Sequence, residues 1–160
     1  MKAEPRRVLF VCLGNICRSP AAEGVFRHLA AKGNLPEAAI CDSCGTAGWH
    51  AGNLADARMR AAAEKRGYAL THRARALRAE DFERFDLILT MDEENLADAL
   101  ERCPRSEWRG KVKPFAAYCR KSRPGFIPDP YYGGAEGFER VLDLLEEGCA
   151  ALIEELREGK

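Results

Sequence analysis

The sequence predicts an α/β fold in three layers, with helices on both faces of a central sheet of four parallel strands. Short apolar runs alternate along the chain with longer amphipathic segments, which is the pattern of strands joined by crossover helices. The run Val8–Cys12 is apolar at every position, as expected for a strand buried on both faces. No repeat, low-complexity tract or linker interrupts the pattern, so we expect residues 1–160 to form one domain.

The other expected elements follow in a regular order. After the first strand, Ser19 is a good N-cap, Pro20 suits the first helical position, and Gly33 can end the helix. We then expect strand 38–44, helix 55–66, strand 85–90, helix 92–101 with Asp92 as its N-cap, strand 111–115, an irregular stretch 119–134 and helix 135–157. In such sheets a functional site lies beyond the carboxyl ends of the strands.

The composition excludes some classes of function. The chain has 25 basic and 25 acidic residues, and this balance argues against a nucleic-acid partner. No apolar run is long enough to span a membrane, and the N-terminus is too short and too polar for a signal peptide. We therefore expect a cytoplasmic protein. Its seven cysteines are an odd number and are interpreted as thiols.

The segment Cys12–Ser19, CLGNICRS, lies between the first strand and the following helix. A loop in this position turns backbone N–H groups inward and forms a nest for an anion. Gly14 and Asn15 tolerate unusual backbone angles. Arg18 offers a planar fork that can grip two oxygens of a tetrahedral anion. We therefore predict that this loop binds phosphate or a similar oxyanion.

Cys12 is the candidate nucleophile of this loop. The helix N-terminus and Arg18 both favour the thiolate form, and a thiolate below a bound phosphate can attack phosphorus to give a phosphocysteine. Ser19 could donate a hydrogen bond to the sulfur when it leaves. The Gly-Lys-Ser/Thr ending of a nucleotide-binding P-loop is absent. A Cys-x5-Arg spacing alone more often reflects a buried cysteine near a surface arginine, but the preceding strand and the enclosed Gly-Asn favour the catalytic interpretation.

A second candidate group lies in the late segment IPDPYYGG, residues 127–134. Asp129 stands between two prolines, which stiffen the loop. A carboxylic acid there can protonate a departing oxygen and then act as a base on water. Asp-Pro alone is usually a simple turn. The adjacent Tyr131 and Tyr132 instead favour a wall for a flat substrate, although exposed tyrosines are also common.

The segments CLGNICRSP and DPYY together resemble the low-molecular-weight protein tyrosine phosphatases, and the likeness covers nearly the whole chain. It implies a flavodoxin-like sandwich with strand order 2-1-3-4. It also implies a catalytic nucleophile, phosphate clamp and general acid/base in Cys12, Arg18 and Asp129. Supporting roles would fall to Ser19, which tunes the thiolate, and to the loop anchor Asn15 with its partners Ser43 and His72.

The resemblance also implies the surroundings of the substrate. Phosphate would be held by Leu13, Gly14, Asn15, Ile16, Cys17 and Arg18. A slot for the substrate ring would be lined by Leu13, Ile16, Trp49, Tyr131 and Tyr132. The family-like segments DARMR and DLILTMDEEN are assigned to the scaffold. We expect a monomer that acts on phosphotyrosine-containing proteins and small aryl phosphates, with no cofactor, no metal, and no nucleic-acid or membrane partner.

The remaining cysteines leave two questions open. Cys41-x2-Cys44 could be half of a redox or zinc site, but no second pair with ligand spacing follows, so core packing is favoured. Cys17 lies in the same loop as Cys12, and the resemblance implies a reversible disulfide between them under peroxide. A neighbouring thiol that traps an oxidised cysteine protects it from further oxidation. Simple packing of Cys17 beside the loop is an equal alternative.

Three other functions compete with the phosphotyrosine phosphatase. Arginine-selective members of the superfamily tend to carry threonine at the position of Ile16, so this side chain favours an aryl substrate. An arsenate reductase needs a further cysteine pair on a mobile segment, and residues 72–90 contain no cysteine. A non-catalytic phosphate-binding module would need neither a thiolate nor an acid.

Overall fold

The computed structural model describes residues 6–33, 40–131 and 133–158, and it confirms the α/β prediction. The described strands form one four-stranded parallel sheet with the order β2-β1-β3-β4, as expected. These strands are β1 (Arg7–Cys12), β2 (Ile40–Gly45), β3 (Leu87–Thr90) and β4 (Val112–Pro114).

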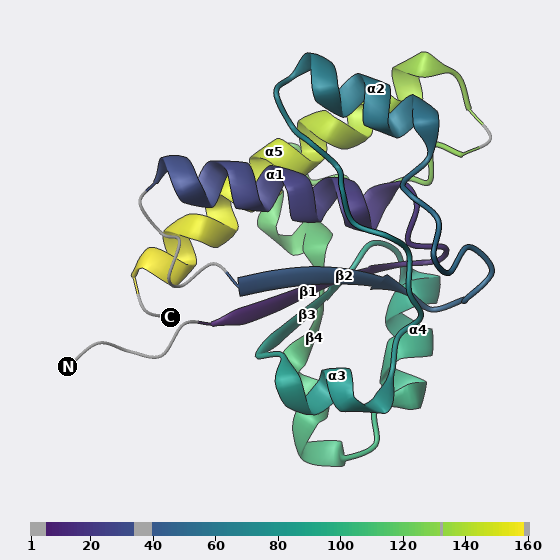
Figure 1. The fold of residues 1–160 in the computed structure, drawn as a ribbon. Coiled ribbons are helices and arrows are strands. Elements are labelled where there is room, and N and C mark those ends of the chain that lie inside the picture. Colours follow the sequence, from purple (N-terminus) through teal and green to yellow (C-terminus); the bar gives the residue numbers. More distant parts are fainter. Residues whose placement is uncertain (1–5, 34–39, 132, 159–160) are drawn as a thin grey trace.

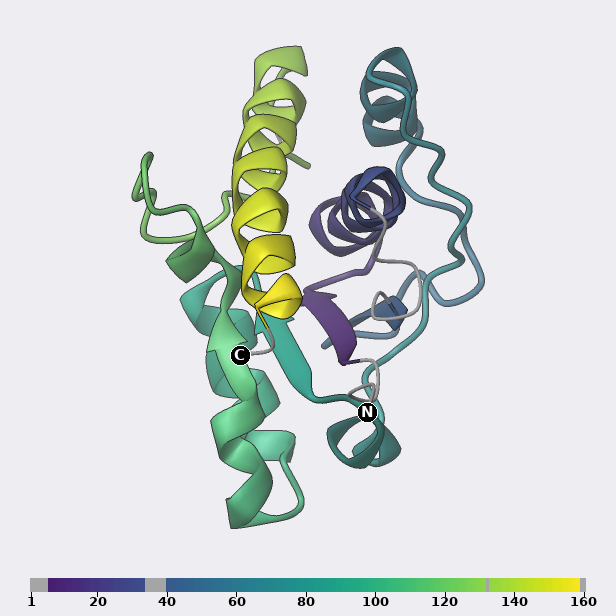
Figure 2. The ribbon, with the colours of Figure 1, turned by 90° about the vertical axis from the view of Figure 1, so that its left-hand side faces the viewer.

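Helices cover both faces of the sheet (Figures 1 and 2). On one side lie α1 (Arg18–Lys32), α2 (Ala57–Lys65) and the long α5 (Ala135–Arg157), and on the other lie α3 (Ala79–Arg84) and α4 (Glu93–Arg102). Two 3-10 turns, η1 (Ser106–Lys111) and η2 (Phe115–Tyr118), flank β4. None of the described helices combines the length and apolar character needed to cross a membrane.

Successive side chains of β1 alternate between the two hydrophobic cores on opposite faces of the sheet. Val8, Phe10 and Cys12 pack into the core beneath α1 and α5. Leu9 and Val11 point the other way, into the core beneath α3 and α4. Successive side chains of a strand face opposite sides of the sheet, so a central strand must be apolar throughout.

The strand order also determines where a site can form. The chain leaves β1, crosses through α1 to β2 on one side, and later returns to β3 on the other side of β1. The order therefore reverses next to β1, and a crevice opens there at the carboxyl ends of the strands. The loop that follows Cys12 begins at this point.

The start of α1 differs from the prediction. The helix begins at Arg18, and its N-cap is Cys17, without a side-chain capping bond. The assignment of Ser19 as N-cap and Pro20 as first helical residue is therefore wrong. The physical reason is that the Ser19 hydroxyl is engaged by Cys12 and Asn15 and is not available to cap the helix.

Other boundaries shift by a few residues. Helix α2 begins at Ala57, after an Asp56 N-cap whose carboxylate accepts from the backbone N–H of Arg58. The predicted N-cap of α4 is confirmed, because Asp92 accepts from the N–H of Asn95. Expected strand residues 38–39 lie outside the described residues. The six-residue α3 was not expected, because so short a helix carries little periodicity.

The outer edge of β2 is covered by side chains and by a neighbouring segment. Arg27 donates from Nη2 to the carbonyl of Cys41 at 2.9 Å. The Gly45 N–H donates to the carbonyl of Arg75, and the Leu77 N–H donates to the carbonyl of Gly45, each at 2.8 Å. The exposed side of this edge strand is therefore partly bonded within the same chain.

A glycine in α5 sets the distance between this helix and η2. A Cβ added at Gly148 would lie 2.3 Å from Phe115 Cζ. Gly148→Ala should therefore destabilise the fold by about 1–2 kcal/mol, because overpacking outweighs the better helix propensity of alanine. Chemical denaturation would measure this. Gly110→Ala, whose Cβ would meet nothing within 4 Å, is the control, and equal effects of both substitutions would contradict the packing argument.

Candidate active site

The loop after β1 lines a cavity of about 140 Å³. Cys12 is 3% exposed, whereas Trp49 is 75% exposed, so the cavity runs from a buried sulfur to an exposed indole. It brings together most of the predicted pocket residues and one that was not predicted, His50. Its lining consists of Cys12, Leu13, Gly14, Ile16, Cys17, Arg18, Trp49, His50, Asp129 and Tyr131. Predicted Tyr132 lies outside the described residues.

The backbone of this loop is held from outside. The carbonyls of Cys12, Leu13 and Ile16 accept hydrogen bonds of 2.7–2.9 Å from backbone N–H groups of the segments that follow β2 and precede α2. In a trans peptide the N–H points opposite to the C=O. The N–H groups that follow these carbonyls are therefore turned away from the scaffold, toward the cavity, as an anion nest requires.

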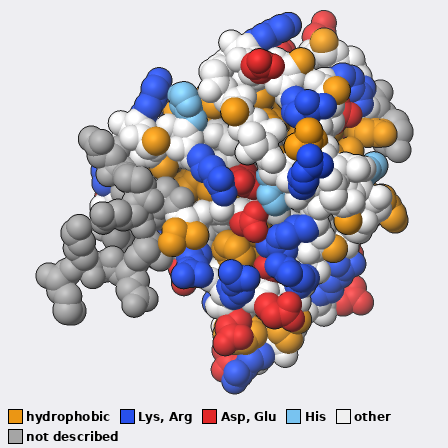
Figure 3. All heavy atoms as spheres, viewed as in Figure 1, with side chains coloured by type: hydrophobic (Ala, Val, Ile, Leu, Met, Phe, Trp, Pro, Cys, Tyr) orange, Lys and Arg blue, Asp and Glu red, His pale blue; other side chains and the backbone are white. Residues whose placement is uncertain are grey.

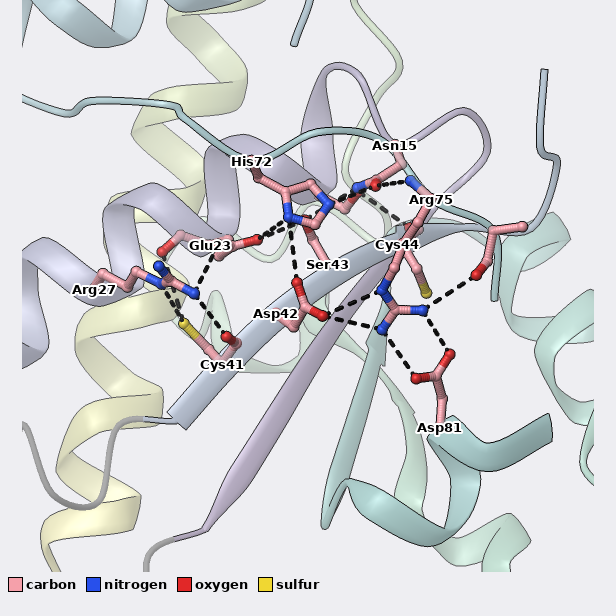
Figure 4. Close-up of polar contacts among 12 residues, drawn as sticks. Asn15, Glu23, Arg27, Cys41, Asp42, Ser43, Cys44, His72, Arg75 and Asp81 are labelled. Carbon is pink, nitrogen blue, oxygen red and sulfur yellow. Dashed lines mark hydrogen bonds and ion pairs between the residues drawn. The ribbon is translucent and has the colours of Figure 1, made fainter. Parts of the chain in front are cut away.

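Asn15 is the residue that fixes the loop conformation. It has a left-handed backbone, with φ of 59°, and is 1% exposed. Its Nδ2 donates to Ser19 Oγ at 2.7 Å and to Ser43 Oγ at 3.1 Å. Its Oδ1 accepts from the Arg75 N–H at 3.0 Å and faces His72 Nε2 at 2.9 Å (Figure 4). The structure thus brings together Asn15 and the partners that the sequence predicted.

A further set of charged groups lies behind these contacts and was not predicted. Ser43 donates to Glu23 Oε1 at 2.7 Å, and Arg27 pairs with Glu23 Oε2 at 3.0 Å. His72 Nδ1 lies 3.3 Å from carboxylate oxygens of both Glu23 and Asp42 (Figure 4). Burial raises the pKa of Glu23, while Ser43 and His72 oppose this shift. Glu23, Arg27, Asp42 and His72 therefore form a partly buried network of paired charges behind the loop anchor.

Glu23, Asp42 and His72 offer ligand atoms within 4.8 Å of one another, the spacing of a metal site. Arg75 pairs with Asp42 at 3.1 Å and Arg27 with Glu23, so both carboxylates already have cationic partners. This environment disfavours an added cation. On the surface around this region, acidic and basic side chains are interspersed (Figure 3).

The Cys12 sulfur lies 3.0 Å from Ser19 Oγ. The hydroxyl receives a hydrogen bond from Asn15 and also lies 3.3 Å from the carbonyl of Cys44. Its single proton can therefore go to that carbonyl or to the Cys12 sulfur. A thiolate would draw the proton to sulfur, because charge-assisted hydrogen bonds are the stronger ones.

Arg18 is 2% exposed and is held rigidly. Its Nη1 donates to Asp92 Oδ2 at 2.7 Å and to the Ile127 carbonyl at 3.0 Å, and its Nη2 lies 3.6 Å from Asp129 Oδ2. Burial acts to lower the pKa of Arg18, but Cys12 and Asp92 outweigh burial and raise it. Asp92 was predicted only as an N-cap. Its position just after β3, at the same edge of the sheet, was the signal for this second contact.

The role of Gly14 differs from the one that the sequence predicted. Gly14 does not have a positive φ. Space favours a glycine here instead, because a Cβ would lie 3.0 Å from His50 Cδ2 and would crowd that side chain. Cys17 is buried, and burial, followed by the nearby Asp56 and Cys12, raises its pKa. Cys17 is therefore held in the thiol form.

The other predicted cysteine pair does not form a site. Cys41 packs in the core beneath α1 and accepts from Arg27 Nε at 3.4 Å, whereas Cys44 packs in the core beneath α3 and α4. Residues three apart on a strand face opposite sides of the sheet. The expectation of core packing is therefore confirmed.

Known proteins have similar sequences and the same fold. The family model described as low molecular weight phosphotyrosine protein phosphatase matches residues 7–160. A putative low molecular weight protein-tyrosine-phosphatase of Synechocystis is 46% identical over 150 residues, which cover 94% of this chain and 96% of the relative.

Solved structures agree. The Entamoeba histolytica protein tyrosine phosphatase with Hepes in its active site matches with a TM-score of 0.93 and 45% identity, over 96% of this chain and 98% of the other. The Drosophila arginine phosphatase matches with a TM-score of 0.87 and 32% identity, over 93% and 96%. This chain therefore belongs to the low molecular weight phosphotyrosine protein phosphatase family, a family of hydrolase enzymes.

Proposed function

We propose that this chain hydrolyses phosphotyrosine in proteins, and small aryl phosphates, through a phosphocysteine intermediate on Cys12. One observation carries the proposal. A single cavity holds a buried cysteine sulfur, a fixed guanidinium and a carboxylate, those of Cys12, Arg18 and Asp129. The Hepes bound in the active site of the Entamoeba relative carries a sulfonate, which is a tetrahedral oxyanion like phosphate.

In the first step the Cys12 thiolate attacks phosphorus. The S–P bond forms as the P–O bond to the phenol breaks, and Asp129 transfers its proton to the departing oxygen. Arg18 and the loop N–H groups bind the phosphoryl oxygens, where negative charge is concentrated in the transition state. The product of this step is a free phenol and a phosphocysteine.

In the second step Asp129, now a carboxylate, accepts a proton from water as that water attacks phosphorus. The S–P bond breaks, inorganic phosphate forms, and the electron pair returns to the sulfur. Ser19 Oγ, 3.0 Å from that sulfur, stabilises the leaving thiolate. The cycle therefore ends with the Cys12 thiolate and the protonated Asp129 regenerated.

The form of the cavity supports an aryl substrate. The sulfur is buried, while Trp49 and Tyr131 at the mouth are exposed, so a long flat phosphoester reaches the nucleophile better than a short one. Ile16 lines the cavity and favours an aryl group over phosphoarginine. Because the Drosophila arginine phosphatase shares the fold, phosphoarginine is the second substrate to assay.

We also propose a monomeric, cytoplasmic enzyme, without metal or cofactor, whose loop is subject to oxidation. All seven cysteines are free, which suits a reducing compartment. Peroxide would oxidise the Cys12 thiolate to a sulfenic acid, and the Cys17 sulfur would displace water to form a disulfide. Both sulfurs line the same cavity. Packing alone is the competing role of Cys17.

The nucleophile can be tested with para-nitrophenyl phosphate at mildly acidic pH. Cys12→Ser should lower turnover at least ~1000-fold, because the nucleophile is lost, while inorganic phosphate still binds. EDTA should leave the wild-type rate unchanged. Full activity of the variant, or loss of wild-type activity in EDTA, would refute the proposed mechanism.

The acid can be tested by comparing leaving groups. Asp129→Ala should reduce kcat/KM for phenyl phosphate by ~100-fold or more, and that for para-nitrophenyl phosphate by less than about tenfold, because nitrophenolate needs less help from a proton. A parallel assay of Asp98→Ala, a half-buried position on α4 that does not line the cavity, provides the control. Equal losses for both esters would remove Asp129 from the acid role.

The loop anchor can be tested with two substitutions at one position. Asn15→Gly removes the amide but keeps the left-handed backbone, and Asn15→Ala adds about 1–2 kcal/mol of backbone strain. Both should destabilise the fold by roughly 2–3 kcal/mol through unpaired buried partners, with alanine the worse. Urea denaturation and the inhibition constant of phosphate report the two effects. Wild-type stability and phosphate affinity in the glycine variant would show that the amide does not hold the loop.

A further inference from the structure

The start of α2 is linked to the loop after Cys12. The backbone N–H of Asp56 donates to the Ile16 carbonyl at 2.7 Å. The Asp56 carboxylate in turn holds Arg58 with both oxygens, since Nε lies 3.1 Å from Oδ1 and Nη2 lies 3.0 Å from Oδ2. The hydrogen bond from Arg58 lowers the pKa of Asp56. The orientation of the Arg58 guanidinium is therefore set from the side of the nucleophile loop.

The same guanidinium reaches the segment that carries Asp129. Its Nη2 donates to the Tyr131 carbonyl at 3.0 Å. Its central carbon lies 5.4 Å from the ring centre of Tyr131 and 4.9 Å from that of Phe138 on α5, both within the range of cation–π contact. Arg58 thus joins α2, α5 and the late loop.

Tyr131 connects this contact to the acid. The Tyr131 N–H donates to Asp129 Oδ1 at 3.0 Å, so the residue whose carbonyl Arg58 holds also orients the carboxylate. The other carboxylate oxygen of Asp129 lies 3.6 Å from Arg18 Nη2. The side chain of Asp129 is 39% exposed, and protein packing alone therefore constrains it weakly.

From these contacts we infer that Arg58 is a positioning residue, which holds the Asp129 carboxylate at a fixed distance from the Cys12–Arg18 loop through Asp56 on one side and Tyr131 on the other. This inference rests on the proposed function, in which Asp129 transfers the proton. Arg58 itself touches no reacting atom. A displacement of about 1 Å at a catalytic group is enough to reduce a rate strongly.

The competing role for Arg58 is to stabilise the fold by joining α2 to α5. The chain offers a matched control for this role. Arg66, just after α2, binds three carboxylates of α5, with the closest oxygens 2.6–2.9 Å away, and its Nη2 also donates to the Glu139 carbonyl on the same helix. Arg66→Ala therefore weakens the same helix pair without touching the late loop.

The experiment measures kcat/KM for phenyl phosphate and para-nitrophenyl phosphate in Arg58→Ala, Arg58→Met, Arg58→Lys, Arg66→Ala, Asp129→Ala and the double variant Arg58→Ala/Asp129→Ala. Arg58→Ala should lose roughly tenfold on phenyl phosphate and less than about threefold on the nitrophenyl ester, because only the former depends strongly on the acid. Methionine keeps an apolar stem near the two rings but loses the donor, so it should behave like alanine. Lysine keeps a donor and should recover part of the loss.

The remaining variants separate the possible failures. Arg66→Ala should change both esters equally, and Arg58→Ala should add no loss in the Asp129→Ala background, because the two substitutions remove one function. Equal losses on both esters in Arg58→Ala, or an additive loss in the double variant, would overturn the inference while leaving the proposed acid in place. If Asp129→Ala changes kcat/KM equally for the two esters, both the inference about Arg58 and the proposed acid role of Asp129 are overturned. If the alanine variant does not fold, the methionine and lysine variants give the same comparison.

Discussion

The amide of Asn15 is the interaction on which the arrangement of the cavity depends. A left-handed residue is unfavourable for most side chains, yet this conformation is what allows the chain to turn between β1 and α1. Four hydrogen bonds hold it, to α1, β2 and the segment that follows α2. Because the partners come from three separate parts of the sequence, the shape of the loop is a property of the whole fold.

A second constraint is the rigidity of Arg18. A buried guanidinium is unfavourable unless it is paired, and Asp92 and the Ile127 carbonyl satisfy one end of it. The plane of the Arg18 guanidinium is therefore fixed before a ligand binds. Little side-chain entropy is then lost on binding, which favours affinity for a small anion. The same burial keeps the guanidinium charge close to the Cys12 sulfur.

The sequence predicted most of the fold and the central residues of the cavity. The strands and the long α5 follow from apolar runs and periodicity, the strand order follows from the family resemblance, and Cys12, Arg18 and Asp129 stand in recognisable local segments. The paired charges Glu23, Asp42 and Arg75 were not predicted. Each looks like an ordinary surface residue, and only tertiary packing brings them together.

Predictions from local helix-capping preferences were incomplete where the side chain also makes a tertiary contact. Ser19 has the composition of an N-cap, but its hydroxyl contacts the Cys12 sulfur and leaves the cap to the backbone of Cys17. Asp92 does cap its helix, yet it also binds Arg18. Propensities describe what a residue does when nothing else competes for it, and near a functional site competition is common.

The covered edge of β2 has a consequence for how copies of this protein meet. An open edge strand offers a row of unpaired N–H and C=O groups to any neighbouring chain. Here Arg27 occupies one carbonyl, and the segment 75–77 occupies the end of the strand next to the cavity. At the opposite edge, β4 is three residues long and ends in Pro114, which has no N–H to donate. Both edges therefore offer few free backbone groups to another copy, and this reduces the tendency of the central sheet to extend from one molecule to the next.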